Sequence, residues 1–262
     1  MKIDEIKDQE YWKLKKDQEY WKLKWERKEK SSFIIPAPEP EWLATDLLLY
    51  LPGEGKILEA GCGLGKWVFF LLKNGYDIHG IDYVQDVIEK NKKMCGETRI
   101  CEPERFSVGN VQKLEFPDSS FDGYISLGVI EHYHDPSPIL KEAHRVLKTG
   151  GIMFLTVPNQ LSPYWWHYLL SYHFSKNMIY HRCMSRFFLR RLIIPFGFKC
   201  IASHNRDVPS AFRHGFWLDR KTVKGLPNPF YYISEPIKFL GKITDRIFPF
   251  MGYISVFVGQ KI

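Results

Sequence analysis

Residues 57–65 read ILEAGCGLG, and this short stretch decides the fold. Its first half is apolar, which is typical of a short buried strand, and its second half has a glycine at every other position. Glycines are needed where a ligand lies against the backbone, because a Cβ atom would collide with that ligand. A helix that begins near Gly65 would point free N–H groups and the positive end of its dipole at the ligand. The stretch therefore predicts a strand, a ligand-binding turn and a helix.

Three further motifs stand where later strands are expected to end. GIDY at 80–83 ends the second strand with Asp82, whose carboxylate can accept hydrogen bonds from both hydroxyls of a ribose, and Tyr83 can stack on a flat base. Asn110 follows the third strand, and its amide can read an adenine edge with both a donor and an acceptor. LGVIEHYHD at 127–135 follows the fourth strand. Ligands of open α/β sheets bind at the carboxyl ends of strands, so the motifs predict one shared crevice.

Strands and helices alternate along the chain from residue 56. The clearest helix is expected at 136–148, with Asp135 as its cap, Pro136 in its first turn and Gly150 and Gly151 after its end. The alternation predicts an α/β fold that is Rossmann-like and doubly wound, a mostly parallel seven-stranded sheet with helices on both faces. The expected strands are 56–60, 78–81, 105–108, 121–126, 152–157, 198–203 and 253–258, and the other expected helices are 41–51, 67–73, 84–94 and 186–195.

Together these motifs resemble the class I S-adenosylmethionine-dependent methyltransferases, in particular the branch often called type 11. The resemblance is close over 56–158 and loose beyond. An NAD-binding fingerprint would need its third glycine where Lys66 stands, so binding of that dinucleotide is disfavoured. The segments that carry the resemblance are EAGCGLG, GID, GNV, FDGYISLGVIEH and RVLKTGGIMFLTVPN.

The resemblance implies S-adenosylmethionine as cofactor and a set of residues that hold its methionine end. The backbone around Gly61, Gly63 and Gly65, with Glu59 behind it, would surround this end. The carbonyl of Leu127 would accept a hydrogen bond from the methionine ammonium.

A second set would hold the adenosine end. Asp82 would bind the ribose, Tyr83 and Val111 would flank the adenine, and Asn110 would contact the adenine amine. The family more often has Asp at the position of Asn110, which leaves base binding plausible but weaker.

The chemistry of methyl transfer demands little of the protein, because the sulfonium is already activated and the leaving thioether is neutral. The protein must align a nucleophile with the methyl group and exclude water. A base is needed only if the nucleophile carries a proton of high pKa. His132, beside the expected methyl position, is the candidate base, with a purely structural role as the alternative. No metal is implied.

The C-terminal part has a composition of its own. Residues 160–262 hold 15 Lys and Arg against 4 Asp and Glu, and 22 of the 41 aromatic residues. We expect this part to complete the sheet and to form an aromatic and basic cap from two insertions, 160–185 and 206–249. The candidate acceptor-binding residues in the cap are Tyr164, Trp165 and Trp166.

The leading hypothesis is therefore transfer of a methyl group to a small-molecule acceptor that is anionic or lipid-like, with O-, N- and C-methylation all open. Arginines at 182, 186, 190 and 191 could bind phosphate or a membrane surface, or could simply form a solvated helix face. A nucleic-acid methyltransferase is a second hypothesis, disfavoured because no RNA-binding module is recognisable. A third is a non-catalytic, methyltransferase-like binding subunit. The oligomeric state stays open.

The N-terminal part, 1–40, is expected to be a helical extension ahead of the cofactor-binding core at 41–159. It contains a duplication, DQEYWKLKK at 8–16 followed by DQEYWKLKW at 17–25. Nine residues put the copies half a turn out of phase in one helix, so both cannot dock alike on one core. We expect the first copy to be dispensable.

The five cysteines have wide spacings and form no C-x-x-C pair, so the sequence predicts reduced thiols. It shows neither a secretory leader nor an apolar run long enough to span a membrane. These features favour a cytoplasmic protein, with peripheral contact to a membrane or lipid through the basic aromatic part as an open alternative.

Overall fold

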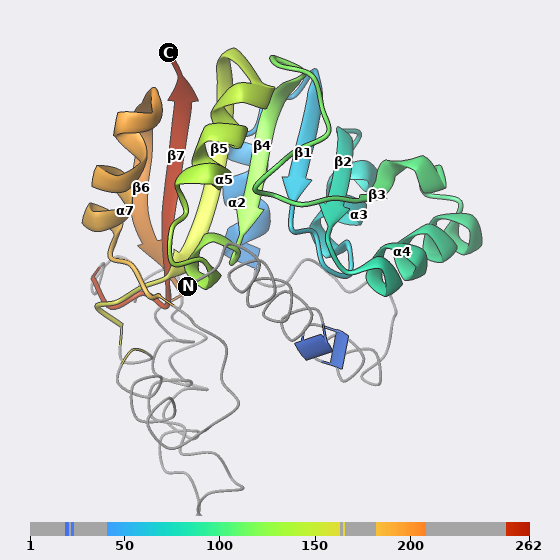
Figure 1. Cartoon of the computed structure of the whole chain (residues 1–262), viewed down its shortest axis with the longest axis horizontal. Coiled ribbons are helices and arrows are strands. Elements are labelled where there is room, and N and C mark those ends of the chain that lie inside the picture. The colour runs from blue at the N-terminus through green and yellow to red at the C-terminus, as the bar shows by residue number, and fades with distance from the viewer. Residues whose placement is uncertain (1–18, 21, 24–40, 163–164, 166–181, 208–249) are drawn as a thin grey trace, which may run out of the picture.

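The computed structural model describes residues 19–20, 22–23, 41–162, 165, 182–207 and 250–262. They form a seven-stranded sheet in the order β3-β2-β1-β4-β5-β7-β6 (Figure 1). β1 to β5 run parallel, and β7 lies antiparallel between β5 and β6. The predicted mostly parallel, seven-stranded α/β sheet is thus confirmed. The strands are β1 Lys56–Ala60, β2 Asp77–Asp82, β3 Phe106–Val108, β4 Phe121–Leu127, β5 Leu147–Pro158, β6 Phe198–Arg206 and β7 Ile254–Lys261.

Helices cover both faces of this sheet, because successive strand residues point to opposite sides and most of them are apolar. Ile57 packs with one helix layer and Leu58 with the other. The first layer contains α2 Glu41–Tyr50, α3 Lys66–Lys73 and α4 Gln85–Thr98, and the second contains α5 Ser137–Val146 and α7 Arg186–Ile193. Short 3₁₀ turns lie at η1 Pro103–Arg105, η2 Ile130–His132 and η3 Ile194–Phe196.

The helix expected at 136–148 is shorter than predicted. Its last residue is Val146, and β5 begins at once with Leu147, opposite Phe121 of β4. Gly150 and Gly151, expected just beyond the helix, lie inside this strand, where a bulge shifts the register. The Asp135 carboxylate does accept a hydrogen bond from the Ser137 N–H at 2.9 Å.

The expectation of five reduced thiols is wrong for one pair, because Cys95 and Cys101 form a disulfide. The left-handed residue Arg99 ends α4 and turns the chain back, which brings the two Cα atoms to 5.0 Å. Nothing in a spacing of six residues reveals that turn. The remaining cysteines, Cys62, Cys183 and Cys200, are free.

The cap and the N-terminal extension are described only in part. Residues 182–185 lie against the sheet, where the Met184 N–H donates to the Pro158 carbonyl at 2.8 Å and the Met184 side chain is buried. The first nonapeptide copy, 8–16, and most of the insertions at 160–185 and 206–249 lie outside the described residues. No helix in the described part of the chain is long and apolar enough to cross a membrane.

Candidate functional site

The turn after β1 is built so that only glycine fits at Gly61. The N–H groups of Gly61 and Cys62 both donate to the Ile81 carbonyl at 2.8 Å, which folds the turn over the end of β2. Gly61 has φ 82°, and a Cβ atom there would lie 2.6 Å from a methyl group of Val129, in the connection after β4. The glycine therefore serves both the turn and the close approach of the connection.

Asp82 joins the glycine turn to the next helix. One carboxylate oxygen accepts from the Gly63 N–H and the other from the Val84 N–H, each at 3.0 Å. Burial raises the pKa of Asp82, and these backbone donors oppose that rise. The Gly109 N–H donates to the Asp82 carbonyl at 3.0 Å, so the end of β3 lies beside it.

Glu59 is a buried acid beneath the glycine turn, only 2% exposed. Burial, and then the nearby charge of Asp82, raise its pKa to about 8, although the Val68 N–H in the first turn of α3 donates to it. Oε2 has no hydrogen-bond partner among the described residues. A buried carboxyl group with an unused oxygen suits a cationic group bound above the turn.

Asn91 is a site residue that the sequence analysis did not single out. Its amide donates to the Gly63 carbonyl at 2.8 Å, and its side chain is fully buried. It shares the apolar face of α4 with Val87, Ile88 and Cys95. A polar residue on an apolar helix face was the signal that could have revealed it.

The end of β4 supplies Leu127 and the η2 turn that carries His132. His132 Nε2 lies 4.0 Å from Oε1 of Glu131, whose side chain is 2% exposed. Glu131, to which the sequence analysis gave no role, also accepts the Arg182 N–H at its carbonyl. His134 is exposed to solvent. His132 thus lies next to a buried acid at the same sheet edge as the glycine turn.

The residues predicted to hold adenine have mixed environments. Tyr83 is half-buried and Val111 is buried. Asn110 is exposed, and its side-chain oxygen accepts from the Gln112 N–H at 2.9 Å, so its acceptor is used within its own turn. Trp165 is half-buried, whereas Tyr164 and Trp166 lie outside the described residues.

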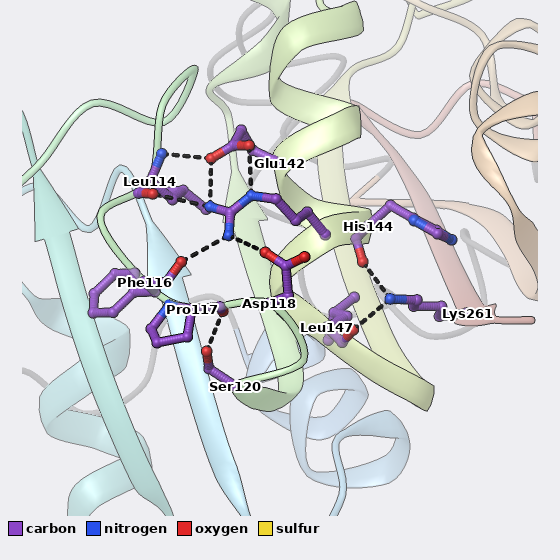
Figure 2. A network of polar contacts seen from close by, with 10 residues as sticks. Leu114, Phe116, Pro117, Asp118, Ser120, Glu142, His144, Leu147 and Lys261 are labelled. Carbon is purple, nitrogen blue, oxygen red and sulfur yellow. Dashed lines mark hydrogen bonds and ion pairs between the residues drawn. The ribbon is translucent and has the colours of Figure 1, made fainter.

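The connection between Val111 and β4 is fixed by Arg145 of α5 (Figure 2). All three guanidinium nitrogens donate, to the Glu142 carboxylate, the Asp118 carboxylate and the carbonyls of Leu114 and Phe116, at 2.7–2.9 Å. These acceptors raise the pKa of Arg145 further above its ordinary value. The permanent positive charge of Arg145 therefore anchors the connection that follows Asn110 and Val111, the two residues predicted to contact adenine.

A pocket of about 620 Å³ adjoins Tyr83 at this edge. Its lining comes from the β2–α4 turn, the end of β3 and the described residues of the second nonapeptide copy. The lining residues are Glu19, Lys22, Leu23, Tyr83, Val84, Gln85, Asp86 and Val108.

Comparison with known proteins agrees with this geometry. A family model described as "Methyltransferase domain" matches residues 58–155. A probable S-adenosylmethionine-dependent methyltransferase of Mycolicibacterium smegmatis is 29% identical over 40% of this chain and 39% of its own length. The 2-methyl-6-phytyl-1,4-hydroquinone methyltransferase of Synechocystis sp. is 32% identical over 42% of this chain and 34% of its own. This chain thus spans about two fifths or less of these curated relatives.

Among solved structures, the geranyl diphosphate C-methyltransferase of Streptomyces coelicolor, determined with S-adenosyl-L-homocysteine, has a TM-score of 0.57. It is 17% identical, and the match covers 84% of this chain and 79% of that chain, which shows a shared fold. The relative of Mycolicibacterium smegmatis is a probable S-adenosylmethionine-dependent enzyme, and S-adenosylmethionine is the cofactor that the sequence motifs implied. Residues 58–155 of this chain therefore form a class I S-adenosylmethionine-dependent methyltransferase domain.

Proposed function

We propose that this protein transfers the methyl group of S-adenosylmethionine to a small-molecule acceptor with an apolar body and a negative charge. The observation that carries the proposal is the Asp82 carboxylate, tied to the glycine turn on one side and to the start of α4 on the other. Such a carboxylate, beside a half-buried aromatic ring and a glycine turn, matches the ribose of an adenosyl cofactor.

The described residues fit that cofactor. Glu59 offers an unused buried oxygen beneath the turn, where it would attract the methionine ammonium. Gly61 lets the connection after β4 approach the turn closely, because a Cβ atom there would collide with Val129. Tyr83 and Val111 would flank the base, and the Leu127 carbonyl would accept from the ammonium.

When bound, S-adenosylmethionine supplies an activated methyl group on a positively charged sulfur, so the protein mainly positions the acceptor. His132 would accept the acceptor's proton where the acceptor needs to lose one. Glu131, 4.0 Å from the ring nitrogen, would favour the protonated imidazole that results.

Two features favour an acceptor that is both apolar and anionic. Around α7, Arg182 lies over the ring of Phe188 at 4.7 Å, and Arg186 lies over the rings of Phe187 and Phe250. Named acceptors among the similar proteins include a phytyl hydroquinone and geranyl diphosphate, which have long apolar chains. Cations beside aromatic rings suit such molecules, and peripheral contact with a lipid surface would follow from the same chemistry.

Replacement of Asp82 tests cofactor binding. We expect Asp82→Ala to weaken the affinity for S-adenosylmethionine about 10- to 100-fold by calorimetry, because hydrogen bonds to a charged group are lost. Asp77→Ala is the matched control: it removes an acid from the other end of β2, where Asp77 pairs with Arg105 at the surface, and should leave affinity unchanged.

Unchanged affinity in the Asp82→Ala protein would place the ribose elsewhere and contradict the proposal. The thermal midpoint of each variant without cofactor shows whether folding, rather than binding, has changed. Incubation with methyl-labelled cofactor and a metabolite extract then identifies the acceptor by the product that carries label.

A further inference from the structure

Two exposed apolar side chains lie in the same pocket beside Tyr83. Val108 at the end of β3 is 52% exposed, and Leu23 of the second nonapeptide copy is 47% exposed. They come from segments more than 80 residues apart, and together with Tyr83 they give the pocket apolar surface. Apolar side chains left open to solvent in one pocket suit a flat, mostly apolar ligand group.

The second copy is attached to the domain by an ion pair. Lys22 Nζ lies 2.5 Å from the Asp86 carboxylate, in the first turn of α4. The hydrogen bond from Lys22 holds the pKa of Asp86 below its ordinary value. Both side chains are about half exposed, so the pair is weak by itself, but it holds the neighbouring Leu23 in place at the pocket.

We infer that Lys22 and Leu23 of the second nonapeptide copy belong to the cofactor site. Leu23 and Val108 contact the outer edge of the adenine of S-adenosylmethionine, whose faces Tyr83 and Val111 flank, and Lys22 anchors Leu23 through Asp86. The inference rests on the proposed function. It assigns the N-terminal extension a role in binding the adenosine end, which the glycine turn does not contact. Glu19 and Gln85, which also line the pocket, supply polar groups for the edge of the base.

The duplication provides an internal control for the experiment. Lys13 and Leu14 of the first copy correspond to Lys22 and Leu23 in the same local sequence, EYWKLK. The variants are Leu23→Ala and Lys22→Glu, with Leu14→Ala and Lys13→Glu as matched controls, all in the full-length chain. Binding of two probes is measured by calorimetry: S-adenosylhomocysteine, and 5′-methylthioadenosine, which lacks the amino-acid end.

We expect Leu23→Ala to weaken both probes by the same factor, about three- to tenfold, because the lost contact is to the shared adenosine. Lys22→Glu should weaken both by a similar factor at low salt and by less at high salt, since the pair is exposed. Adding Asp86→Lys to Lys22→Glu restores the ion pair with reversed charges and should return the affinity to within about twofold of wild type. The first-copy controls should bind like wild type.

The inference would be overturned if the unmodified protein binds both probes and the Leu23→Ala and Lys22→Glu variants bind them with the same affinity. That result would leave the proposed function intact. Equal weakening by the first-copy variants would overturn it as well, because the effect would then not belong to the pocket. Absence of binding by the wild-type protein would contradict the proposed function itself. Thermal midpoints without ligand separate lost folding from lost binding.

Discussion

At the scale of single residues, the site depends on two buried acids that differ in their hydrogen bonds. Both carboxylate oxygens of Asp82 accept backbone N–H groups, whereas Glu59 has a buried oxygen without a partner among the described residues. Burial and the charge of Asp82 raise the pKa of Glu59 to about 8, so Glu59 stays neutral near pH 7 until a cation approaches. Each Asp82 oxygen accepts one backbone N–H and has a second lone pair that a ribose hydroxyl would use, whereas the unpartnered oxygen of Glu59 would face the cationic end of the cofactor.

This difference predicts a pH effect on stability. Between the ordinary Glu value near 4.5 and about 8, folded Glu59 keeps a proton that the unfolded chain releases. Stability is therefore lost as pH rises through this window, by up to about 1.4 kcal/mol per pH unit. Glu59→Gln cannot ionise, so its free energy of unfolding should fall less between pH 5 and 8 than that of wild type. Urea unfolding at several pH values measures this, and parallel pH curves for the two proteins would refute the assignment.

At the scale of elements, the β3–β4 connection has no regular structure of its own and is held by Arg145. The guanidinium of Arg145 binds this connection at Leu114, Phe116 and Asp118 and also binds Glu142 of α5, as Figure 2 shows. The positions of Asn110 and Val111, which come before β4, therefore depend on α5, which comes after β4 in the sequence. Lysine cannot replace this arrangement, because one ammonium lacks the planar set of donors.

Arg145→Lys should lower the free energy of unfolding by about 2–4 kcal/mol, since several buried or half-buried acceptors lose their donor. The control is Arg105→Lys, the same change at an ion pair with Asp77 whose side chains are 40% and 44% exposed. That change should cost less than about 1 kcal/mol. Chemical denaturation of both variants gives the comparison, and equal losses would show that the Arg145 network adds nothing beyond one ion pair.

At the scale of the whole molecule, strands β1 and β2 and helix α7 lie toward opposite ends of the sheet (Figure 1). The glycine turn follows β1 and Asp82 ends β2, whereas α7 packs beside β6 at the far edge of the sheet. The outer surface of α7 presents exposed Arg190 and Phe187, with Arg186 half-buried beside them. The proposed contact with an anionic lipid surface would therefore be made by α7 and not by the strands that carry the glycine turn and Asp82.

Reversal of Arg186 and Arg190 to Glu tests this arrangement. We expect the double variant to lose binding to vesicles of anionic phospholipid about tenfold or more at low salt, with a smaller difference at high salt, because long-range attraction is screened. The control is the double variant Lys92→Glu and Lys93→Glu, at two exposed positions of α4. It makes the same change of charge on a helix beside β2 and β3 and should bind vesicles like the unmodified protein. Cosedimentation measures both. Wild-type binding by the α7 variant would exclude α7 as the lipid-facing surface.

Most of the fold could be predicted because its signals are local. The apolar strand before EAGCGLG, the helix after it, and Asp82 at the end of the next strand all follow from residue order and periodicity, and the structure has each of them within a few residues. Element ends were less predictable. Val146 rather than Lys148 ends α5, because pairing of Leu147 with β4 competes successfully with another half-turn of helix.

The sequence by itself determined the seven-stranded α/β sheet, the methyltransferase motifs and the position of Asp82 at a strand end, because hydrophobic periodicity and glycine spacing act over a few neighbouring residues. Only the tertiary structure decided what meets at the site. Asn91 contacts the glycine turn from α4, Leu23 and Val108 line one pocket, and Cys95 bonds to Cys101 because of a turn that no motif predicts. Such contacts join segments far apart in sequence or depend on the path of a turn. Packing, rather than local pattern, selects them.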